Sequence, residues 1–179
     1  MSPGNVIGTQ MNIGFPGSYS RNGDCIIANR LVQSTDASGP KFGNGVVLNT
    51  NNTYSDIATW IAAGGTLTAA VFAGIAVREV QQSTTYTTQS SGIYNPGTDC
   101  DALERGSAVV NCLVGTPTSG GAVYMRKTLN ASIPAGIVGG FEAAADGTNT
   151  VQLTNCQWTT GAKDANNVAE LTILTRLAP

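Results

Sequence analysis

The sequence predicts an all-β domain, a jelly-roll-like sandwich or small barrel of about eight short antiparallel strands, with one short helix and an extended N-terminal arm. Short apolar segments recur from residue 24 onward, separated by turns rich in Gly, Asn and Pro, and several segments alternate apolar with polar residues. The chain lacks the alternation of strand and helix patterns that produces a parallel sheet, and it has no repeat of fixed period. These observations favour antiparallel strands joined by turns.

The first part of the chain, residues 1–20, is predicted to be an extended arm. Pro3-Gly4 and Pro16-Gly17 indicate turns or extended backbone, and the apolar residues between them are widely spaced. Such a segment is either a terminus without fixed structure or an arm that docks on a neighbouring molecule. The sequence leaves both interpretations open, and the β-rich domain takes the remainder, residues 21–179.

The predicted strands share an apolar or alternating pattern bounded by turn residues: 25–28, 45–48, 71–80, 107–114, 122–125, 151–158 and 168–177. The fourth and fifth strands are separated by a Gly- and Pro-containing loop, so residues 107–125 are predicted to form a hairpin. The parity of the apolar residues changes within 151–158, which predicts a bulge near Asn155. In the last strand, Leu171 and Ile173 are expected to face the core and Glu170 to face solvent.

One segment, Ser55 to Ala63, has the pattern of a helix. Ser55 is expected to be the N-cap, and Asp56 lies favourably near the positive end of the helix dipole. Gly64-Gly65 is expected to end the helix, because glycine adopts the backbone conformation that terminates helices.

The charge content argues against a nucleic-acid partner. Charged residues make up 11 % of the chain, compared with about a quarter in an average globular domain. The nine basic residues are scattered, with Arg126-Lys127 the only adjacent pair, whereas a nucleic-acid surface needs a basic cluster. Because so low a charge content weakens electrostatic repulsion between copies, dense packing beside identical copies is tolerated.

No membrane or export segment is expected. The longest apolar run, residues 69–77, is much shorter than the roughly 20 residues of a membrane span. The N-terminus has no basic segment followed by an apolar run, so we expect a protein made and kept, or assembled, in a cytosol. The even number of cysteines allows two disulfides, but buried free thiols are expected in a reducing compartment, at Cys25, Cys100, Cys112 and Cys156.

The residue types give little support for catalysis. The chain contains no histidine, which excludes Ser-His-Asp and Cys-His mechanisms and histidine-ligated metal sites. The cysteines lack the short spacings of a zinc site, and no phosphate-binding loop motif occurs. A hydrolase that used Ser or carboxylates would need an activating partner, and none is evident. We therefore expect no enzymatic activity, no cofactor or metal, and no small-molecule substrate.

Two acidic pairs are candidates for other roles. Glu142 and Asp146 lie four residues apart in the stretch GGFEAAADGTNT, which is predicted to be a loop or single helical turn before the strand at Thr150. They would act as acid and base only if the fold placed them around a substrate. Asp99 and Asp101 flank Cys100 and are expected in a turn that leads into the next strand, because calcium would need further oxygen ligands.

Several segments agree in order and spacing with a known group of proteins. These segments are GFPG (14–17), FG followed by VVLN (42–49), FAGIAVREV (72–80), YNPG (94–97), CDALERG (100–106), GFEAAADG (140–147) and AELTILTR (169–176). Together, over about residues 12–177, they resemble the structural cement, or decoration, proteins of tailed-bacteriophage capsids.

The resemblance implies a non-enzymatic virion protein. Such a protein binds the outer surface of the head, bridges neighbouring major capsid subunits and stabilises the expanded capsid. It assembles in the bacterial host cytoplasm and forms homodimers or homotrimers. On this interpretation residues 21–179 are the cement domain and residues 1–20 its arm.

The residues expected at a partner interface are hydrophobic arm residues and charged residues that are scarce in this chain. The charged pairs at 78–79 and 104–105 are either ordinary surface charges or specific pairs across an interface, and the sequence leaves both open. The expected interface residues are Ile13, Phe15, Arg21, Arg78, Glu79, Glu104 and Arg105. An alternative function is a glycan- or receptor-binding module of a phage tail fibre or spike, which would need exposed aromatic platforms.

Overall fold

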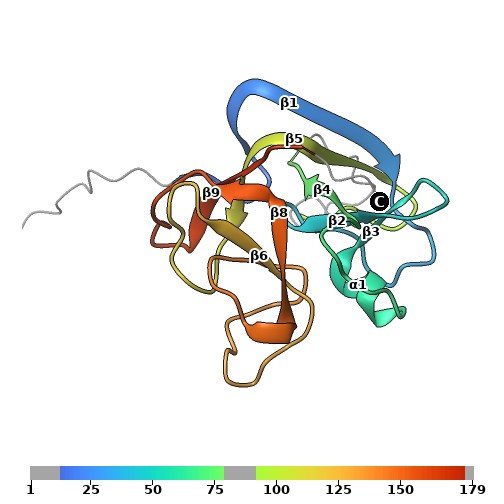
Figure 1. The fold of residues 1–179 in the computed structure, drawn as a ribbon. Coiled ribbons are helices and arrows are strands. Elements are labelled where there is room, and N and C mark those ends of the chain that lie inside the picture. The colour runs from blue at the N-terminus through green and yellow to red at the C-terminus, as the bar shows by residue number, and fades with distance from the viewer. Residues whose placement is uncertain (1–12, 79–91, 176–179) are drawn as a thin grey trace, which may run out of the picture.

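The structure, a computed structural model, describes residues 13–78 and 92–175 (Figure 1). This part of the chain is almost entirely β, with one short α-helix and one turn of 3-10 helix. Its elements are β1 (Tyr19–Leu31), β2 (Gly45–Leu48), β3 (Tyr54–Asp56), α1 (Ile57–Ala62), β4 (Phe72–Ala76), β5 (Asp99–Asn111), β6 (Ala122–Arg126), β7 (Phe141–Glu142), η1 (Gly147–Asn149), β8 (Thr150–Trp158) and β9 (Val168–Ile173). The predicted all-β class with one short helix is confirmed.

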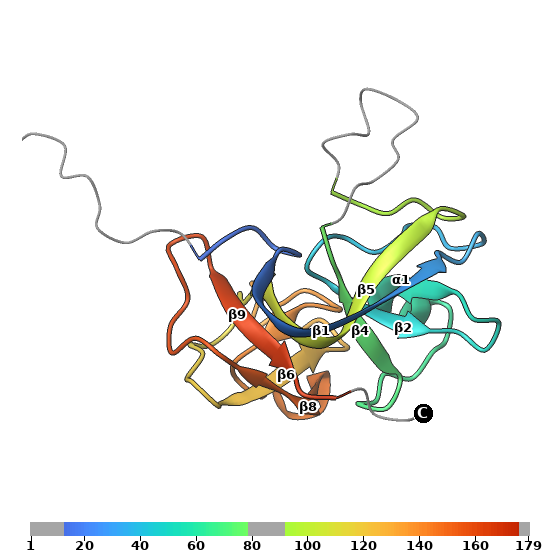
Figure 2. The same ribbon diagram turned by 90° about the horizontal axis from the view of Figure 1, so that it is seen from above.

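The strands form one antiparallel sheet that curls on itself. Its order is β3-β2-β4-β5-β9-β8-β6-β7, and β1 pairs with β5 outside this path. β5 pairs with β1, β4 and β9. It therefore joins the half of the sheet formed by β3, β2 and β4 to the half formed by β9, β8, β6 and β7. A parallel bridge between Val32 and Tyr54 brings the end of β1 beside β3. Figure 2 shows β1 lying along β5, with the two halves of the sheet on either side, and the result is a half-barrel.

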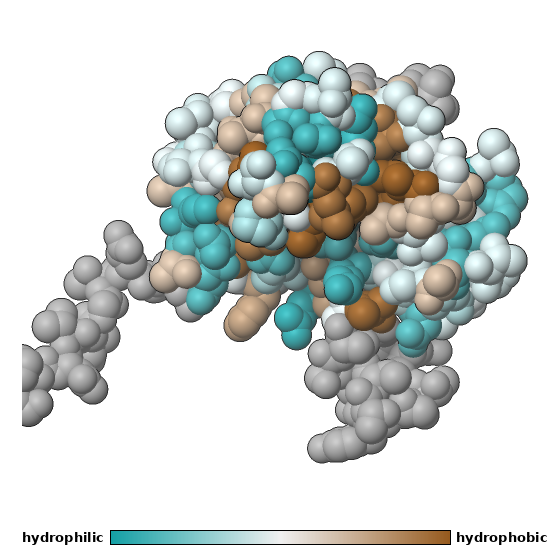
Figure 3. Space-filling view, turned by 90° about the horizontal axis from the view of Figure 1, so that it is seen from below, coloured by the Kyte–Doolittle hydropathy of each residue, from teal (hydrophilic) through white to brown (hydrophobic). Residues whose placement is uncertain are grey.

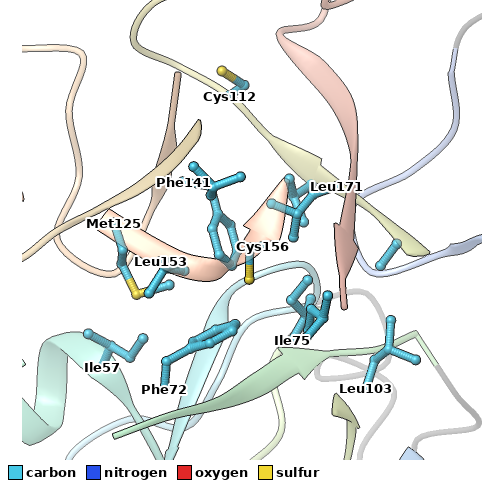
Figure 4. Packing of buried hydrophobic residues seen from close by; sticks show 14 of the residues in the cluster. Ile57, Phe72, Ile75, Leu103, Cys112, Met125, Phe141, Leu153, Cys156 and Leu171 are labelled. Atoms are coloured by element: carbon cyan, nitrogen blue, oxygen red, sulfur yellow. The ribbon is translucent and has the colours of Figure 1, made fainter. Parts of the chain in front are cut away.

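The two halves of the sheet face each other across the larger hydrophobic core (Figure 4). Ile57 and Phe72 come from the half that contains α1, and they point toward Met125, Phe141 and Leu153 of the other half. The rings of Phe72 and Phe141 meet edge to face with their centroids 6.1 Å apart. All five side chains are at most 2 % exposed. Each contributes about 1.5–3 kcal/mol relative to an exposed position, so this core fixes the two halves of the sheet against each other.

The hairpin predicted over residues 107–125 is wrong. β5 pairs through residues 106–111 with β9, and β6 pairs with β8. The connection between β5 and β6 runs elsewhere, since Cys112 forms a bridge with Phe141 and the Ala143 N–H donates to the Val114 carbonyl. A loop of this length does not fix the pairing of its strands as a two-residue turn does, so a distant strand takes the place beside β5.

β5 also begins earlier than predicted, at Asp99. Asp99 and Asp101, expected in a turn, lie in the first part of the strand and flank the fully buried Cys100. This alternation is that of a strand with one buried face. The Asp101 carboxylate accepts a hydrogen bond from Asn29 Nδ2 of β1 at 2.8 Å, so it ties the two strands together.

The N-cap of α1 is Asp56 rather than the predicted Ser55. Asp56 has an extended backbone, and its Oδ2 accepts hydrogen bonds from the Ala58 and Thr59 N–H groups at 3.0 and 3.3 Å. Ser55 belongs to β3, and its hydroxyl accepts from Asn49 Nδ2 at 2.8 Å. Both residue types cap helices well, so the extent of β3 decides which of them does so.

Two further predictions are confirmed. The register of β8 against β6 shifts between the Leu153–Val123 and Gln157–Ala122 pairs, which is the bulge predicted near Asn155. The four cysteines are free thiols as predicted, and three of them are buried, whereas Cys25, also expected to be buried, is partly exposed.

The prediction that Glu170 faces solvent is wrong, because this residue is only 5 % exposed. Glu170 belongs to β9, which lies between β5 and β8, so the strand has a neighbour on both edges. An alternating pattern distinguishes the two faces of a strand but does not show what covers the second face.

Candidate interaction surface

The N-terminal residues that the structure describes form a strap, residues 13–18, across the domain. The Gly17 N–H donates to the Val109 carbonyl at 2.8 Å, and the Ser18 carbonyl accepts from the Val109 N–H at 2.9 Å. The Arg78 N–H donates to the Gly17 carbonyl at 2.7 Å. The strap therefore joins β5 to the chain that leaves β4, and the end of the predicted arm belongs to the domain surface.

The Asp164 carboxylate holds the beginning of the strap. It accepts hydrogen bonds from the N–H groups of Ile13 at 3.3 Å and of Asn166 and Val168 at 2.9 Å. Partial desolvation raises the pKa of Asp164, but these three N–H donors outweigh it and hold the pKa below its ordinary value. The carboxylate is thus ionised at neutral pH and fixes the point at which residues 1–12 join the domain.

Two glycines let the strap approach the loop after Pro40 closely. Gly17 and Gly43 have φ values of +85° and +79°, which favour glycine. A Cβ on Gly43 would lie 2.7 Å from Pro16 Cβ, and a Cβ on Gly17 would lie 2.9 Å from the Gly43 nitrogen. These glycines belong to two of the segments that carry the family resemblance, GFPG and FG, so the structure explains why the two segments occur together.

Next to this contact, the Arg78 guanidinium lies close to the rings of Phe15 and Phe42. The Arg78 guanidinium carbon is 5.5 Å from the centroid of the Phe15 ring and 5.8 Å from that of Phe42. Phe42 meets Tyr94 edge to face at 5.2 Å, and the buried Tyr94 hydroxyl donates to the Val77 carbonyl at 2.6 Å. We call Phe15, Arg78 and Phe42 the Arg78 platform.

Phe15 and Arg78 of the platform are exposed and Phe42 is half-buried, although the backbone that carries them is held by hydrogen bonds. Phe15 is 69 % exposed, the highest value for a large hydrophobic residue in the part of the chain that the structure describes. Arginine and aromatic side chains carry much of the binding energy in protein interfaces. A fixed surface of these residues loses little conformational entropy on binding, so the platform is the best candidate contact surface among residues 13–78 and 92–175.

The structure brings together three of the expected interface residues, Ile13, Phe15 and Arg78, on the strap and beside it. Glu104 and Arg105 lie on β5 and are paired within the chain. The side chain of Arg21 and the whole of Glu79 lie outside the described residues.

Glu104 belongs to a cluster that links three strands. Its Oε1 accepts from Arg30 Nη1 at 2.9 Å and from the Tyr54 hydroxyl at 3.1 Å, and Arg30 Nη1 also donates to that hydroxyl. Burial, followed by the nearby Glu104 charge, raises the pKa of Tyr54. Arg105 pairs with Asp24 at 2.6 Å, but both side chains are largely exposed, so this pair contributes little to stability.

Arg126, at the end of β6, is fully buried in an ionic network that the sequence analysis missed. Its Nε and Nη2 donate to the two Glu142 carboxylate oxygens at 2.5 and 2.9 Å, and its Nη1 donates to Asp146 Oδ2 at 2.7 Å. Asn130 Nδ2 donates to both Asp146 oxygens at 3.0 Å. Hydrogen bonding to Arg126 is the main cause that holds the pKa of Asp146 below its ordinary value. A Cβ on Gly136 would lie 2.1 Å from Arg126 Nε, so the backbone packs directly on the guanidinium.

The stretch GGFEAAADGTNT forms β7, a short loop and η1 before β8. The Arg126 network shows that this stretch has a structural role. Both carboxylates of the stretch are occupied by the same guanidinium. A buried arginine paired in this way anchors the loops on both sides of β7, residues 127–140 and 143–149. The geometry thus assigns Glu142 and Asp146 to loop anchoring and gives no support to an acid–base pair.

A cleft of about 510 Å³ lies between the start of α1, the loop before β2 and residues 137–138. On the side of the molecule seen in Figure 3, hydrophobic residues gather near the middle between strips of polar ones. The carboxylate that the cleft lining supplies is that of Asp56, which already caps α1. The cleft therefore lacks an available pair of carboxylates for acid–base chemistry.

Neither tryptophan forms an exposed platform of the kind a glycan-binding site uses. Trp158 is fully buried, and Trp60 packs against the core. Among the described residues, the structure finds no group of three or more metal-ligating side chains and no helix that is long and apolar enough to cross a membrane.

In the described part of this all-β domain, the most exposed large hydrophobic residue, Phe15, is held beside a cation, an arrangement suited to contact with another protein. The family model for the XM1 gp53 minor capsid protein matches residues 4–173 of this chain. The chain belongs to this family of bacteriophage minor capsid proteins. It therefore has a structural role in the virion, where a minor capsid protein associates with the major capsid protein.

A solved structure, the capsid of Myoviridae phage XM1, contains a chain with the same fold. The two chains superpose with a TM-score of 0.62 at 17 % sequence identity, and the match covers 99 % of this chain and 100 % of the other. At this identity the likeness shows the fold alone. No curated protein matches the chain.

Proposed function

We propose that this protein is a capsid cement protein. It binds the outer surface of the phage head, bridges neighbouring major capsid subunits and stabilises the expanded capsid, without catalysis, cofactor or nucleic-acid contact. The observation that carries the proposal is the Arg78 platform, because it offers an exposed and preorganised contact surface in a minor capsid protein. The protein is assembled onto the head in the bacterial host cytoplasm.

The mechanism is multivalent clamping. A standard protein interface buries about 800 Å² on each partner, so one copy has room for contacts with more than one capsid subunit. Once the first contact forms, the second benefits from a high effective concentration. Because the protein binds the assembled lattice and not free subunits, binding stabilises the lattice by the linkage that lets any ligand stabilise the state it binds.

The N-terminal segment and self-association extend this clamp. Residues 13–18 anchor the arm, which leaves residues 1–12 to contact a neighbour. Twelve extended residues reach about 40 Å, enough to leave the footprint of a single domain. Homodimers or homotrimers would add further contacts between copies. Removal of residues 1–12, which leaves the strap intact, tests the arm. We expect the shortened protein to fold but to bind heads more weakly, and undiminished binding would contradict a role of the arm.

The test of the proposed function is co-sedimentation with cement-stripped expanded heads of the parent phage. Unexpanded proheads serve as the control for the lattice state. We expect saturable binding to expanded heads alone, with a copy number that matches one set of symmetry-related positions. A folded protein that sediments with neither form would contradict the proposal and favour a receptor-binding module.

A further inference from the structure

Arg78 differs from the other arginines whose side chains the structure describes. Arg30, Arg105 and Arg126 each pair with a carboxylate of this chain. For Arg78, the described residues supply two aromatic rings and no carboxylate within ion-pair distance. Its backbone N–H is bonded to the Gly17 carbonyl, so the residue is fixed at its base while its charged end is exposed.

We propose that Arg78 is a receptor for a carboxylate, namely an Asp or Glu side chain on the surface of the major capsid protein. This inference rests on the proposed function and names the chemistry of its contact. The Phe15 and Phe42 rings lie beside the exposed guanidinium, and among the described residues no carboxylate lies within ion-pair distance of its N–H groups. A carboxylate is the group that matches these N–H groups best, because it accepts two parallel hydrogen bonds from one guanidinium.

The surroundings of Arg78 strengthen such a contact. The exposed Phe15 ring would be covered by the same partner, which would exclude water from the ion pair and strengthen its hydrogen bonds. The Phe42 ring packs edge to face on Tyr94. The strap is fixed by the hydrogen bonds that Gly17 makes with Val109 and Arg78, so these groups need little ordering on binding.

The overall charge of the chain supports a local mode of recognition. The net charge is −2, so the chain as a whole does not attract an acidic surface. Recognition of a partner carboxylate therefore depends on a particular cation, and Arg78 is one for which the described residues supply no carboxylate partner. Lysine would be a poor substitute, since its ammonium group lacks both the planar stacking and the paired donors.

The experiment measures equilibrium binding to stripped expanded heads at low and high salt for the wild type, Arg78→Gln and Arg78→Lys. Lys127→Gln is the matched control, because Lys127 is a partly exposed basic residue outside the set expected at the interface. We expect Arg78→Gln to weaken binding about 30-fold, the loss typical of an interface hot spot, and to reduce the salt dependence. Arg78→Lys should recover only part of the loss, and Lys127→Gln should bind as the wild type does.

A second arm tests the carboxylate itself. Head carboxylates are converted to amides with a carbodiimide and an amine before binding. We expect wild-type affinity to fall to that of Arg78→Gln, and the affinity of Arg78→Gln to change little. If Arg78→Gln binds heads with the affinity and the salt dependence of the wild type, the inference is overturned but the proposed function stands. Failure of the wild type to bind untreated heads overturns both. Denaturation midpoints of the variants show that each is folded.

Discussion

The buried Arg126 network leads to a prediction whose size follows from the geometry. Glu142→Gln keeps the shape of the side chain but removes the charge that compensates a fully buried guanidinium. Breaking a buried pair by removing one partner costs about 3–5 kcal/mol. We expect the lower value, about 3 kcal/mol, because Asp146 still pairs with Arg126 at 2.7 Å.

Urea denaturation at pH 7 measures this cost. With an m-value of about 2 kcal/mol/M, the midpoint of Glu142→Gln should lie about 1.5 M below that of the wild type. Asp146→Asn should lower the midpoint by less than Glu142→Gln does, because the Asp146 side chain is partly exposed whereas that of Glu142 is buried. A shift below about 0.3 M for Glu142→Gln would refute the assignment of this carboxylate to loop anchoring.

A double-mutant cycle tests whether Arg126 and Glu142 are coupled, because the direction of the midpoint shift should reverse without Arg126. In an Arg126→Met background the Glu142 carboxylate is buried without its cation, so Glu142→Gln should raise the urea midpoint instead of lowering it. If Glu142→Gln lowers the midpoint by the same amount in both backgrounds, the two side chains are not coupled.

Three further predictions concern pH, the helix cap and the thiols. Arg126 lowers the pKa of Asp146 in the folded state. The difference in unfolding free energy between the wild type and Asp146→Asn should therefore be fully present above about pH 4 and disappear as the pH falls through the lowered pKa. Urea midpoints of both proteins between pH 7 and pH 2 measure this difference. Burial raises the pKa of Asp56 although its carboxylate caps α1, so Asp56→Asn should be nearly neutral while Asp56→Ala should cost about 1 kcal/mol. Burial raises the pKa of Cys156 to about 12, so a thiol reagent at pH 8 should label the partly exposed Cys25 in the native protein and the buried cysteines only after unfolding.

Several elements of the fold could be predicted from local patterns, whereas β3, β7 and the pairing of the strands could not. Alternation and turn residues located β8 and the bulge near Asn155, because a bulge changes the parity of apolar residues along one strand. The strand that pairs with residues 106–111 of β5 is β9, which begins more than 50 residues further along the chain. No local pattern records that choice, since any strand with a matching apolar face can occupy the position.

The candidate surface could be predicted only in part for the same reason. Phe15 and Arg78 were expected at an interface because they are scarce residue types in their segments, but their stacking depends on the close approach of Gly17 and Gly43. Arg126 was missed because a basic residue at the end of a strand normally points to solvent. Its proximity to the acidic stretch around Glu142 follows from the pairing of β6 with β7.

We propose that this protein decorates the outside of the head through the Arg78 platform. A cryo-electron microscopy map of stripped expanded heads to which the purified protein has been added would show this directly. We predict density for the β domain on the outer surface, with Phe15 and Arg78 against the major capsid protein and each copy touching more than one subunit. Density inside the shell, or an outer position with the platform facing solvent, would contradict the account.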